Sequence, residues 1–464
     1  MTSLEEKMLE HFEEVVINKS LVEKAGINRD YPAFVVDWVV SRYIRNGEID
    51  SEAIAGFMDK HFPDKTRAQQ VKRRLYRGEE VRLIDRFGVQ VNFKQSRLDL
   101  AIPSLDIRDG QVSPKVANEH EVLFSGNAWG VGTLVFVPGD NKDGSVVLQE
   151  FRPFQTFTVD LNYFRDQRKW FSLEEWVDLL IRSMEYDPGK FSFEEKRMML
   201  YRLIPVVQQR TNMIELAPKG TGKSYVYSRM SKYVWLVSGG TITRAQLLYD
   251  MSRKKAGLLT AFDQVVFDEV QSIKFNNPEE IIGALKGYLE SGSYKVGEFE
   301  GTSAAGLSIL GNIPLSQDLR PRSDNLVNEL PEFMSETAFL DRFHGILPGW
   351  RIPRLTVEHR VKGMGLKADY LSEIYHEFRR KNEYDQFVEQ HLATKGDMRD
   401  SKAVKRIAAG LLKLLFPDLA TVTAEDFELH CYLPARDLRQ RLRSQLALLD
   451  PEYREEIDPM EVVF

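Results

Sequence analysis

Apolar residues recur at different spacings along the chain and divide it into stretches of different character. Residues 1–87 carry them at helical spacing, with amphipathic runs from Leu9 to Val16 and from Phe34 to Tyr43. From residue 88 to about residue 170 they alternate with polar residues in short runs, separated by turn sequences such as Asp109-Gly110. The pattern predicts a helical N-terminal domain, residues 1–87, and a small β-barrel-like domain, residues 88–170.

Beyond residue 171, strand-like and helix-like segments alternate. The sequences Ser172–Glu175 and Ser192–Glu195 have the Ser-x-x-Glu form of a capping box, and each predicts the start of an amphipathic helix. After them we expect strands at 213–216, 233–237, 264–268 and 307–310, with helices at 244–251 and 278–290. Such alternation is typical of a parallel sheet with helices on both faces. The fold class is therefore predicted to be multidomain α/β, with an α/β core at 171–360 and a helical lid subdomain at 361–464.

The chemistry of the predicted core is concentrated after its first strand. There the loop Ala217-Pro218-Lys219-Gly220-Thr221-Gly222-Lys223-Ser224 is followed by a helical pattern through Met230. A strand, a glycine-containing loop, Gly-Lys-Ser and a helix in this order are typical of a phosphate-binding P-loop. In such a loop backbone amides surround phosphate oxygens, Lys223 reaches the β and γ phosphates, and the Ser224 hydroxyl binds Mg²⁺. We therefore expect ATP and Mg²⁺ as cofactors, although Ala217 occupies a position that is usually glycine.

Two carboxylates follow a later apolar strand. Asp268 and Glu269 end the run Val265-Val266-Phe267, about 45 residues beyond the P-loop. Asp268 is expected to hold Mg²⁺ through water, and Glu269 to orient and polarise the attacking water. Because ligands of parallel sheets bind at the carboxyl ends of the strands, we expect both carboxylates to lie beside the P-loop.

Three further side chains are candidates for the same reaction. Asn312 ends the apolar run that begins at Leu307, and it either hydrogen-bonds the attacking water or γ phosphate or begins an ordinary turn. Arg342 is either an arginine finger, which would act on the γ phosphate of a neighbouring subunit in a ring, or part of a structural ion pair. Arg406, on the predicted lid helix, is expected to reach the nucleotide, with Arg399 as a competitor for that role.

A basic stretch in the N-terminal region is the candidate DNA contact. Between residues 65 and 77 there are six basic residues and no acidic residue: Lys65, Arg67, Lys72, Arg73, Arg74 and Arg77. Basic residues spread over one helix can follow the phosphates of duplex DNA, whereas the alternative is a solvated helix surface.

The overall composition narrows the class of protein. The 464 residues are 43% hydrophobic and 28% charged, with a net charge of −6, which is typical of a soluble globular protein of several domains. Cys431 is the one cysteine, so an internal disulfide framework and a cysteine-based zinc site are excluded. The histidines are scattered, and we expect no structural metal. No apolar run reaches membrane-spanning length, so we expect a cytoplasmic protein without a membrane partner.

The order of these motifs resembles that of AAA+ ATPases, and the element Leu340-Asp341-Arg342-Phe343 is similar to that of minichromosome-maintenance helicases. More narrowly, the chain resembles the BrxL family, the Lon-like ATPases of bacterial BREX phage-defence systems, through the stretches 149–187 and 399–417. The resemblance implies an N-terminal DNA-binding region, an AAA+ core, and assembly around duplex DNA into a ring, expected to be a hexamer or stacked rings. It also implies other BREX proteins as partners and a C-terminal protease domain with a Ser-Lys dyad. Since no glycine-flanked Ser with a following Lys occurs after the predicted lid, we expect no protease activity from this chain.

Three functions remain open from the sequence. The favoured one is a ring-forming ATPase that couples ATP binding and hydrolysis to assembly or movement on duplex DNA in antiphage defence. The second is a protein unfoldase, and the third a scaffold that uses ATP only to set its architecture. The segment Ser293–Phe299 is a candidate pore loop, in which Tyr294 would grip peptides or Lys295 would grip phosphates.

Overall fold

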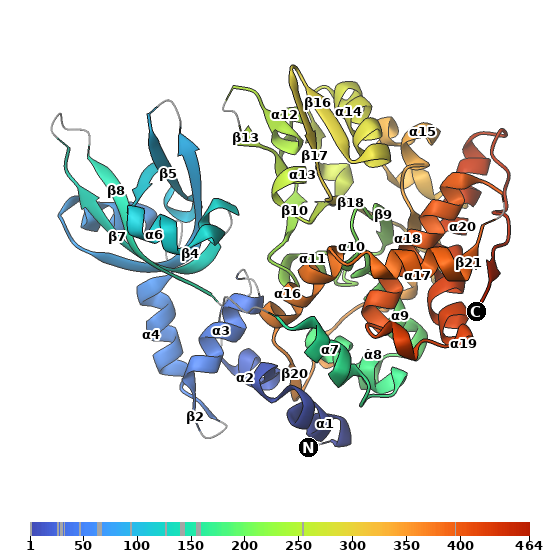
Figure 1. The fold of residues 1–464 in the computed structure, drawn as a ribbon, viewed down its shortest axis with the longest axis horizontal. Coiled ribbons are helices and arrows are strands. Elements are labelled where there is room, and N and C mark those ends of the chain that lie inside the picture. Colours follow the sequence, from blue (N-terminus) through green and yellow to red (C-terminus); the bar gives the residue numbers. More distant parts are fainter. Residues whose placement is uncertain are drawn as a thin grey trace. The chain divides into compact units, whose positions relative to one another are not determined.

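The chain forms two compact units in the computed structural model, Met1–Ser20 with Val159–Phe464, and Leu21–Thr158 (Figure 1). The first is called the ATPase unit below, after the activity that its sequence motifs predict, and the second the barrel unit. The structure describes residues 2–25, 27, 31, 33–45, 48–62, 67–92, 95–125, 128–139, 144–154, 159–252, 255–394 and 396–464, although the side chains of residues 23, 45, 125 and 255 are excepted.

The barrel unit is built on five strands that close into a barrel in the order β4-β5-β6-β8-β7. All neighbouring pairs are antiparallel except β6 and β8, which run parallel, and α6 lies between β6 and β7 in the chain. This connectivity is that of the oligonucleotide/oligosaccharide-binding (OB) barrel. The elements are α2 (Lys19–Lys24, which crosses from the ATPase unit), α3 (Ala33–Tyr43), β2 (Ile44–Arg45), β3 (Glu48–Ile49), α4 (Ser51–His61), α5 (Ala68–Tyr76), β4 (Val81–Asn92), β5 (Arg97–Ile102), β6 (Ile107–Val112), α6 (Pro114–Glu119), β7 (Ala128–Val137) and β8 (Ser145–Pro153).

The ATPase unit contains a five-stranded parallel sheet in the order β10-β14-β18-β9-β19. Its strands are β9 (Met213–Ala217), β10 (Val234–Ser238), β14 (Gln264–Asp268), β18 (Gly306–Asn312) and β19 (Gly345–Pro348). Successive residues enter different apolar clusters, since Val265 and Phe267 pack in one and Val266 packs in the other. The sheet is thus buried on both faces, as the alternation of strands and helices predicts. The sequence prediction omitted β19.

Helices and short strands surround this sheet. The helices are α1 (Ser3–Phe12), α7 (Leu161–Arg168), α8 (Leu173–Ser183), α9 (Phe193–Tyr201), α10 (Ile204–Val207), α11 (Lys223–Arg229), α12 (Arg244–Leu247), α13 (Leu258–Ala261), α14 (Pro278–Ser291), α15 (Thr337–Leu340), α16 (Ala368–Arg379), α17 (Glu383–His391), α18 (Met398–Leu415), α19 (Ala424–Phe427) and α20 (Leu433–Leu449). The short strands are β1 (Val16–Asn18), β11 (Thr241–Ile242), β12 (Tyr249–Asp250), β13 (Lys255–Ala256), β15 (Lys274–Phe275), β16 (Ser293–Val296), β17 (Phe299–Thr302), β20 (Met364–Leu366), β21 (Leu392–Ala393) and β22 (Glu461–Val462). Both predicted capping boxes are present, at the starts of α8 and α9.

The predicted domain boundaries need correction. The boundary at residues 87/88 falls inside β4, and the boundary at 170/171 falls between α7 and α8, which share one core. The first twenty residues belong to the ATPase unit, because β1 pairs with β20 and Lys7 forms an ion pair of 2.7 Å with Glu175. Periodicity identifies a helix or strand but not the partner against which it packs, and these errors follow from that.

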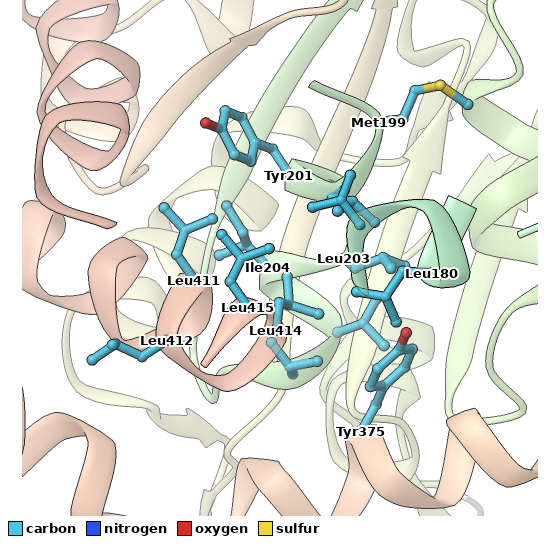
Figure 2. Close-up of a cluster of buried hydrophobic side chains, with 14 of the residues drawn as sticks. Leu180, Met199, Tyr201, Leu203, Ile204, Tyr375, Leu411, Leu412, Leu414 and Leu415 are labelled. Carbon is cyan, nitrogen blue, oxygen red and sulfur yellow. The ribbon is translucent and has the colours of Figure 1, made fainter. Parts of the chain in front are cut away.

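The C-terminal helices are not separate from the core either. Figure 2 shows leucines of α18 among side chains of α8, α9, the start of α10 and α16. The approach is close because α18 carries Gly410, where a Cβ would lie 2.8 Å from Cγ2 of Ile204. The region 361–464, predicted as a lid subdomain, therefore packs in one core with residues 171–207.

Among the described residues, no helix has the length and apolar composition needed to cross a bilayer.

Asp85, a buried carboxyl group of the barrel unit, gives its stability a defined pH dependence. Burial raises the pKa of Asp85 to about 6, although Ser104 and the Arg86 amide donate hydrogen bonds to it. Between its ordinary value of 3.8 and about 6, the folded chain keeps a proton that the unfolded chain releases. The contribution of Asp85 to stability is therefore present below pH 4 and is lost as the pH rises through 6.

We expect Asp85→Asn to remove this loss, which amounts to about 3 kcal/mol over the full window. The measurement is the unfolding free energy of the wild type and the variant in urea at several pH values from 4 to 7. Asp109→Asn, at an exposed position of the same barrel, is the matched control and should follow the wild type. Parallel curves for all three proteins would contradict the assignment.

Candidate nucleotide-binding site

The loop between β9 and α11 has the backbone conformation that its glycines predict. Gly220 and Gly222 have φ angles of +86° and +75°, in the left-handed region that other residues rarely adopt. The helix α11 begins directly afterwards at Lys223, so its amino end points toward the loop. The backbone of residues 217–224 is thus compatible with the predicted P-loop, in which backbone amides and a helix N-terminus bind an anion.

Lys223 is held at this loop by three acceptors. Its Nζ donates to the carbonyl oxygens of Ala217 (2.9 Å) and Pro218 (3.3 Å) and to Oδ1 of Asn312 (3.1 Å). Burial lowers the pKa of Lys223, and the neighbouring charge of Arg202 lowers it further, while the carboxylates of Glu215, Asp268 and Glu269 raise it. The ammonium group therefore lies where the loop, β18 and the carboxylates after β14 meet.

The carboxyl ends of β14, β18 and β9 bring the predicted polar residues together. In register, Phe267 lies opposite Ile309, and Asn312 lies opposite Ala217. Asp268 follows Phe267 directly and is 5% exposed. Its Oδ2 accepts from Ser238 at 3.3 Å, whereas its buried Oδ1 has no hydrogen-bond donor among the described residues.

A buried carboxylate oxygen without a donor is costly unless something else binds it. Its position near Lys223, with which its charge interacts, suits a hydrated Mg²⁺ ion, which takes oxygen ligands and keeps several of its waters. Glu269 is exposed and has a φ angle of +46°, a conformation that few residues other than glycine adopt. Such backbone strain occurs often at functional sites, and here it ends the strand and leaves the Glu269 side chain outside the core.

Gly349 explains the unusual Ala217. Ala217 is fully buried, and a Cβ added at Gly349 would lie 2.5 Å from the Ala217 Cβ. The turn after β19 therefore makes room for the methyl group that distinguishes alanine from the usual glycine. Since the sequence prediction omitted β19, this compensation was not visible in it.

The sequence prediction also missed a buried ion pair beneath the loop. The guanidinium of Arg202 donates to the Glu215 carboxylate from Nη2 at 2.6 Å and to the Thr221 carbonyl from Nη1 at 2.9 Å. The side chains of Arg202 and Glu215 are 0% and 2% exposed. A charged residue inside the apolar run of β9 was the available signal, because a buried charge requires a partner.

Tyr186 is a second residue of the site that the sequence prediction missed. Its hydroxyl is buried, has no hydrogen-bond partner among the described residues, and lies 2.7 Å from where a Cβ would stand at Gly222. Tyrosine is frequent in folded cores, and no pattern in the sequence distinguishes this one.

Three predicted arginines lie at the opposite edge of the sheet. Arg406 donates to the Arg210 carbonyl at 3.1 Å, and the Arg342 carbonyl accepts from Asn212 at 3.3 Å. Arg210 and Asn212 come just before the first residue of β9, whereas the loop begins at the last residue of that strand. A strand of this length separates the two edges by about 15 Å. Arg406 therefore does not lie at the P-loop of its own chain, because of where α18 docks, and its expected contact with a nucleotide stays a prediction.

Arg342 and Arg399 share an acidic partner at that edge. Arg342 Nε lies 3.6 Å from Glu290 Oε2, and Arg399 donates to the same oxygen at 3.4 Å and to Asp341 at 2.7 Å. Arg342 also donates to the Ala338 carbonyl. The ion-pair alternative for Arg342 is thus present within the chain.

The predicted DNA contacts lie on and beside α5. Arg67 is paired with Asp59, and Arg74 with Glu79 at 2.8 Å. For the side chains of Lys72, Arg73 and Arg77, no ion pair is found within the described part of the chain. Lys65 lies outside the described residues.

Two family models match the chain. The model for the ATPase domain of Lon-like protease BrxL-like proteins matches residues 146–458, and the model for the N-terminal region of the BREX system Lon protease-like protein BrxL matches residues 10–136. The chain belongs to the BrxL family. The residues matched by the ATPase-domain model include the whole parallel sheet and the loop 217–224, so the ATPase domain is identified independently of the motif.

Sequence similarity to two curated members of the BrxL family supports this assignment. The Lon-like protease BrxL of Escherichia coli O9:H4 (strain HS) is 31% identical over 449 residues, which are 95% of this chain and 64% of that protein. The Lon-like protease BrxL of Bacillus cereus (strain H3081.97) is 31% identical over 456 residues, which are 96% of this chain and 67% of that protein. The chain thus spans about two thirds of the length of these relatives.

Proposed function

We propose that the chain hydrolyses ATP in the site at the carboxyl edge of the sheet. The observation that carries the proposal is the convergence of Lys223, Asp268 and Asn312 beside a P-loop in an ATPase-domain family. Ser224 and Asp268 would hold Mg²⁺, which supplies charge neutralisation at the phosphates when bound. Lys223 would bind the β and γ phosphates, Asn312 would orient the attacking water, and Glu269 would accept its proton.

We further propose that the active form is a ring. Arg342 lies at the edge of the sheet away from its own P-loop, so it can serve as an arginine finger only toward a nucleotide on a neighbouring subunit. The same reasoning extends to Arg399, which shares Glu290 with Arg342. Contact with the neighbour's nucleotide would then replace the contact with Glu290. A hexamer, or rings stacked in pairs, is the assembly we expect.

Duplex DNA is the proposed partner of the barrel unit. The buried residue Leu75 anchors α5 to the barrel core, which leaves Arg73 and Arg77 exposed on the helix. OB barrels commonly bind nucleic acids through the face formed by their second and third strands. Here that face is occupied by charge pairs, Arg97 with Asp99 at 2.7 Å and Arg108 with Asp106 at 3.2 Å. Arg73 and Arg77, which have no ion pair among the described residues, therefore favour α5 as the contact.

Charge reversal tests the DNA proposal. We expect Lys72, Arg73, Arg74 and Arg77, all replaced by Glu, to lower affinity for a duplex of unspecific sequence by at least about a hundredfold in low salt. The slope of log affinity against log salt should flatten by about 0.9 for each phosphate that the variant no longer neutralises. Fluorescence anisotropy between 50 and 200 mM salt measures both quantities. Arg97→Glu with Arg108→Glu, on β5 and β6, is the control, and equal binding by the α5 variant and the wild type would refute the proposal.

The hairpin of β16 and β17 bears on the unfoldase alternative. Tyr294 is 7% exposed and its hydroxyl lies 2.8 Å from the Thr260 hydroxyl, whereas the Lys295 side chain is 66% exposed. The hairpin thus exposes an ion pair, Lys295 with Glu300 at 2.7 Å, rather than this aromatic ring, which disfavours the peptide-gripping role expected of Tyr294 in an unfoldase. ATP turnover that rises with unfolded protein and not with duplex DNA would reverse this preference.

By family membership, we propose that the chain acts with other BREX proteins in defence against phage.

A further inference from the structure

The segment that follows β19 lies directly on the phosphate loop. At one end, Gly349 is so close that an added Cβ would lie 2.5 Å from Ala217 and 2.7 Å from Oε1 of Glu215. At the other end, the Leu355 amide donates to the Gly220 carbonyl at 2.9 Å. The segment 349–355 is therefore fixed against the loop at both ends.

Arg354 is the residue of this segment that lies over the loop. Its Cγ and Nε are each 3.2 Å from the position that a Cβ would take at Gly220, and the residue is exposed. No hydrogen bond, ion pair or ring contact of its guanidinium is found within the described residues. Arg202, Arg342 and Arg406, in contrast, all have partners.

We infer that Arg354 binds the phosphate chain of the nucleotide held by its own P-loop. The inference rests on the proposed ATP site and adds to it a contact from within the same subunit. A guanidinium presents five N–H donors and forms charge-assisted hydrogen bonds with phosphate oxygens. Lys223 approaches the loop from α11, and Arg354 approaches it from the segment after β19, so the two cations reach it from different elements.

The two arginines of α18, Arg399 and Arg406, lie at the opposite edge of the sheet. Their partners there are Asp341 and Arg210, respectively. Neither can report on the nucleotide of its own chain. Arg354 is therefore the arginine placed to contact the nucleotide of its own chain, and the segment 349–355 couples the occupancy of the loop to the end of β19.

The test compares nucleotides that differ in their number of phosphates. We expect Arg354→Ala to weaken binding of ATP with Mg²⁺ at least tenfold while changing binding of AMP less than twofold. Arg354→Lys should give an intermediate loss for ATP, because it keeps the charge but not the fork of donors. Arg351→Ala changes an exposed arginine three residues earlier in the same segment and should bind like the wild type. Isothermal titration gives the dissociation constants, and unfolding midpoints of the unliganded proteins show that the variants are folded.

The outcomes separate this inference from the proposed function. If the wild type binds no ATP, the nucleotide site itself is wrong. If the wild type binds ATP and Arg354→Ala binds it equally well, only the role of Arg354 is refuted. Equal losses for ATP and AMP, or an equal loss in Arg351→Ala, also refute it, because neither follows from a phosphate contact. Should Arg354→Ala fail to fold, Arg354→Gln, which keeps most of the side-chain volume, replaces it in the same comparison.

Discussion

Glu269→Gln should lower the turnover number for ATP hydrolysis by at least about a hundredfold while ATP still binds, because the amide cannot accept a proton from the attacking water. Glutamine has nearly the same shape, and Lys223, Ser224 and Asp268 are unchanged, so the affinity for ATP should be close to that of the wild type. Glu269 is exposed and has a strained backbone at the end of β14, so it lies outside the core. Its replacement should therefore leave the thermal unfolding midpoint within about two degrees of the wild-type value.

The measurements are phosphate release at saturating ATP and the dissociation constant for ATP with Mg²⁺. Glu332→Gln, an exposed carboxylate elsewhere in the same unit, is the control and should retain full turnover. Unchanged turnover in the Glu269 variant would mean that the hydrolysis site is misplaced. Tight ATP binding by the wild type without any hydrolysis would instead support the scaffold alternative.

Mixing Glu269→Gln with Arg342→Ala tests whether Arg342 acts as an arginine finger between subunits. Each variant alone is expected to be inactive. In a mixed ring, some sites combine an intact Glu269 from one subunit with an intact Arg342 from its neighbour, so phosphate release should recover to a fraction of the wild-type rate. Recovery is excluded if Arg342 acts within its own chain, because each chain then carries one defect.

Glu215→Ala is expected to have the largest effect on stability. It would leave the fully buried guanidinium of Arg202 without its counter-charge, which typically costs about 3–5 kcal/mol. The Thr221 carbonyl would keep its donor, but that donor would no longer be held by Oε1 and Oε2 of Glu215. We therefore expect weaker ATP binding as well as a lower unfolding free energy in urea.

A double variant separates the two effects. Arg202→Met with Glu215→Leu removes both charges and should recover much of the lost stability, since buried ion pairs are often replaceable by apolar residues. It should not recover ATP affinity, because the donor to Thr221 is missing. Lys286→Ala breaks an exposed pair with Glu336 at 2.8 Å and should cost about 1 kcal/mol or less. A similar cost for Lys286→Ala and Glu215→Ala would contradict the argument.

Local signals were sufficient for much of the ATPase unit. The glycines at 220 and 222 permit the left-handed backbone that the loop adopts, the capping boxes at Ser172 and Ser192 form as their spacing predicts, and the apolar runs ending at Ala217 and Asp268 are strands. These features depend on residues a few positions apart. Parallel strands end at one edge of a sheet, and this rule predicted that Lys223, Asp268 and Asn312 lie close together. The structure brings these residues together at that edge.

The strand β19 shows why other features escaped. It has four residues, Gly345–Pro348, and begins and ends with residues that disfavour strands. Its place beside β9 is determined by the sheet edge and by the helix α20 that packs on it, and neither can be read from so short a run. The compensation between Ala217 and Gly349 and the contact of Arg354 with the loop depend on that strand, so they were missed with it.

By itself, the sequence predicted a P-loop and located the two carboxylates at the end of β14, the α/β class and the acid-free stretch that includes α5, because each depends on residues close together in the chain. Tertiary structure alone decided that residues 2–20 complete the ATPase unit, that α18 shares a core with α10, and that Arg406 faces the far edge of the sheet. It also decided that Arg202 lies under the loop and Arg354 over it. These are contacts between residues from 13 to 359 positions apart, and they are set by which surfaces pack together rather than by the local pattern of either segment.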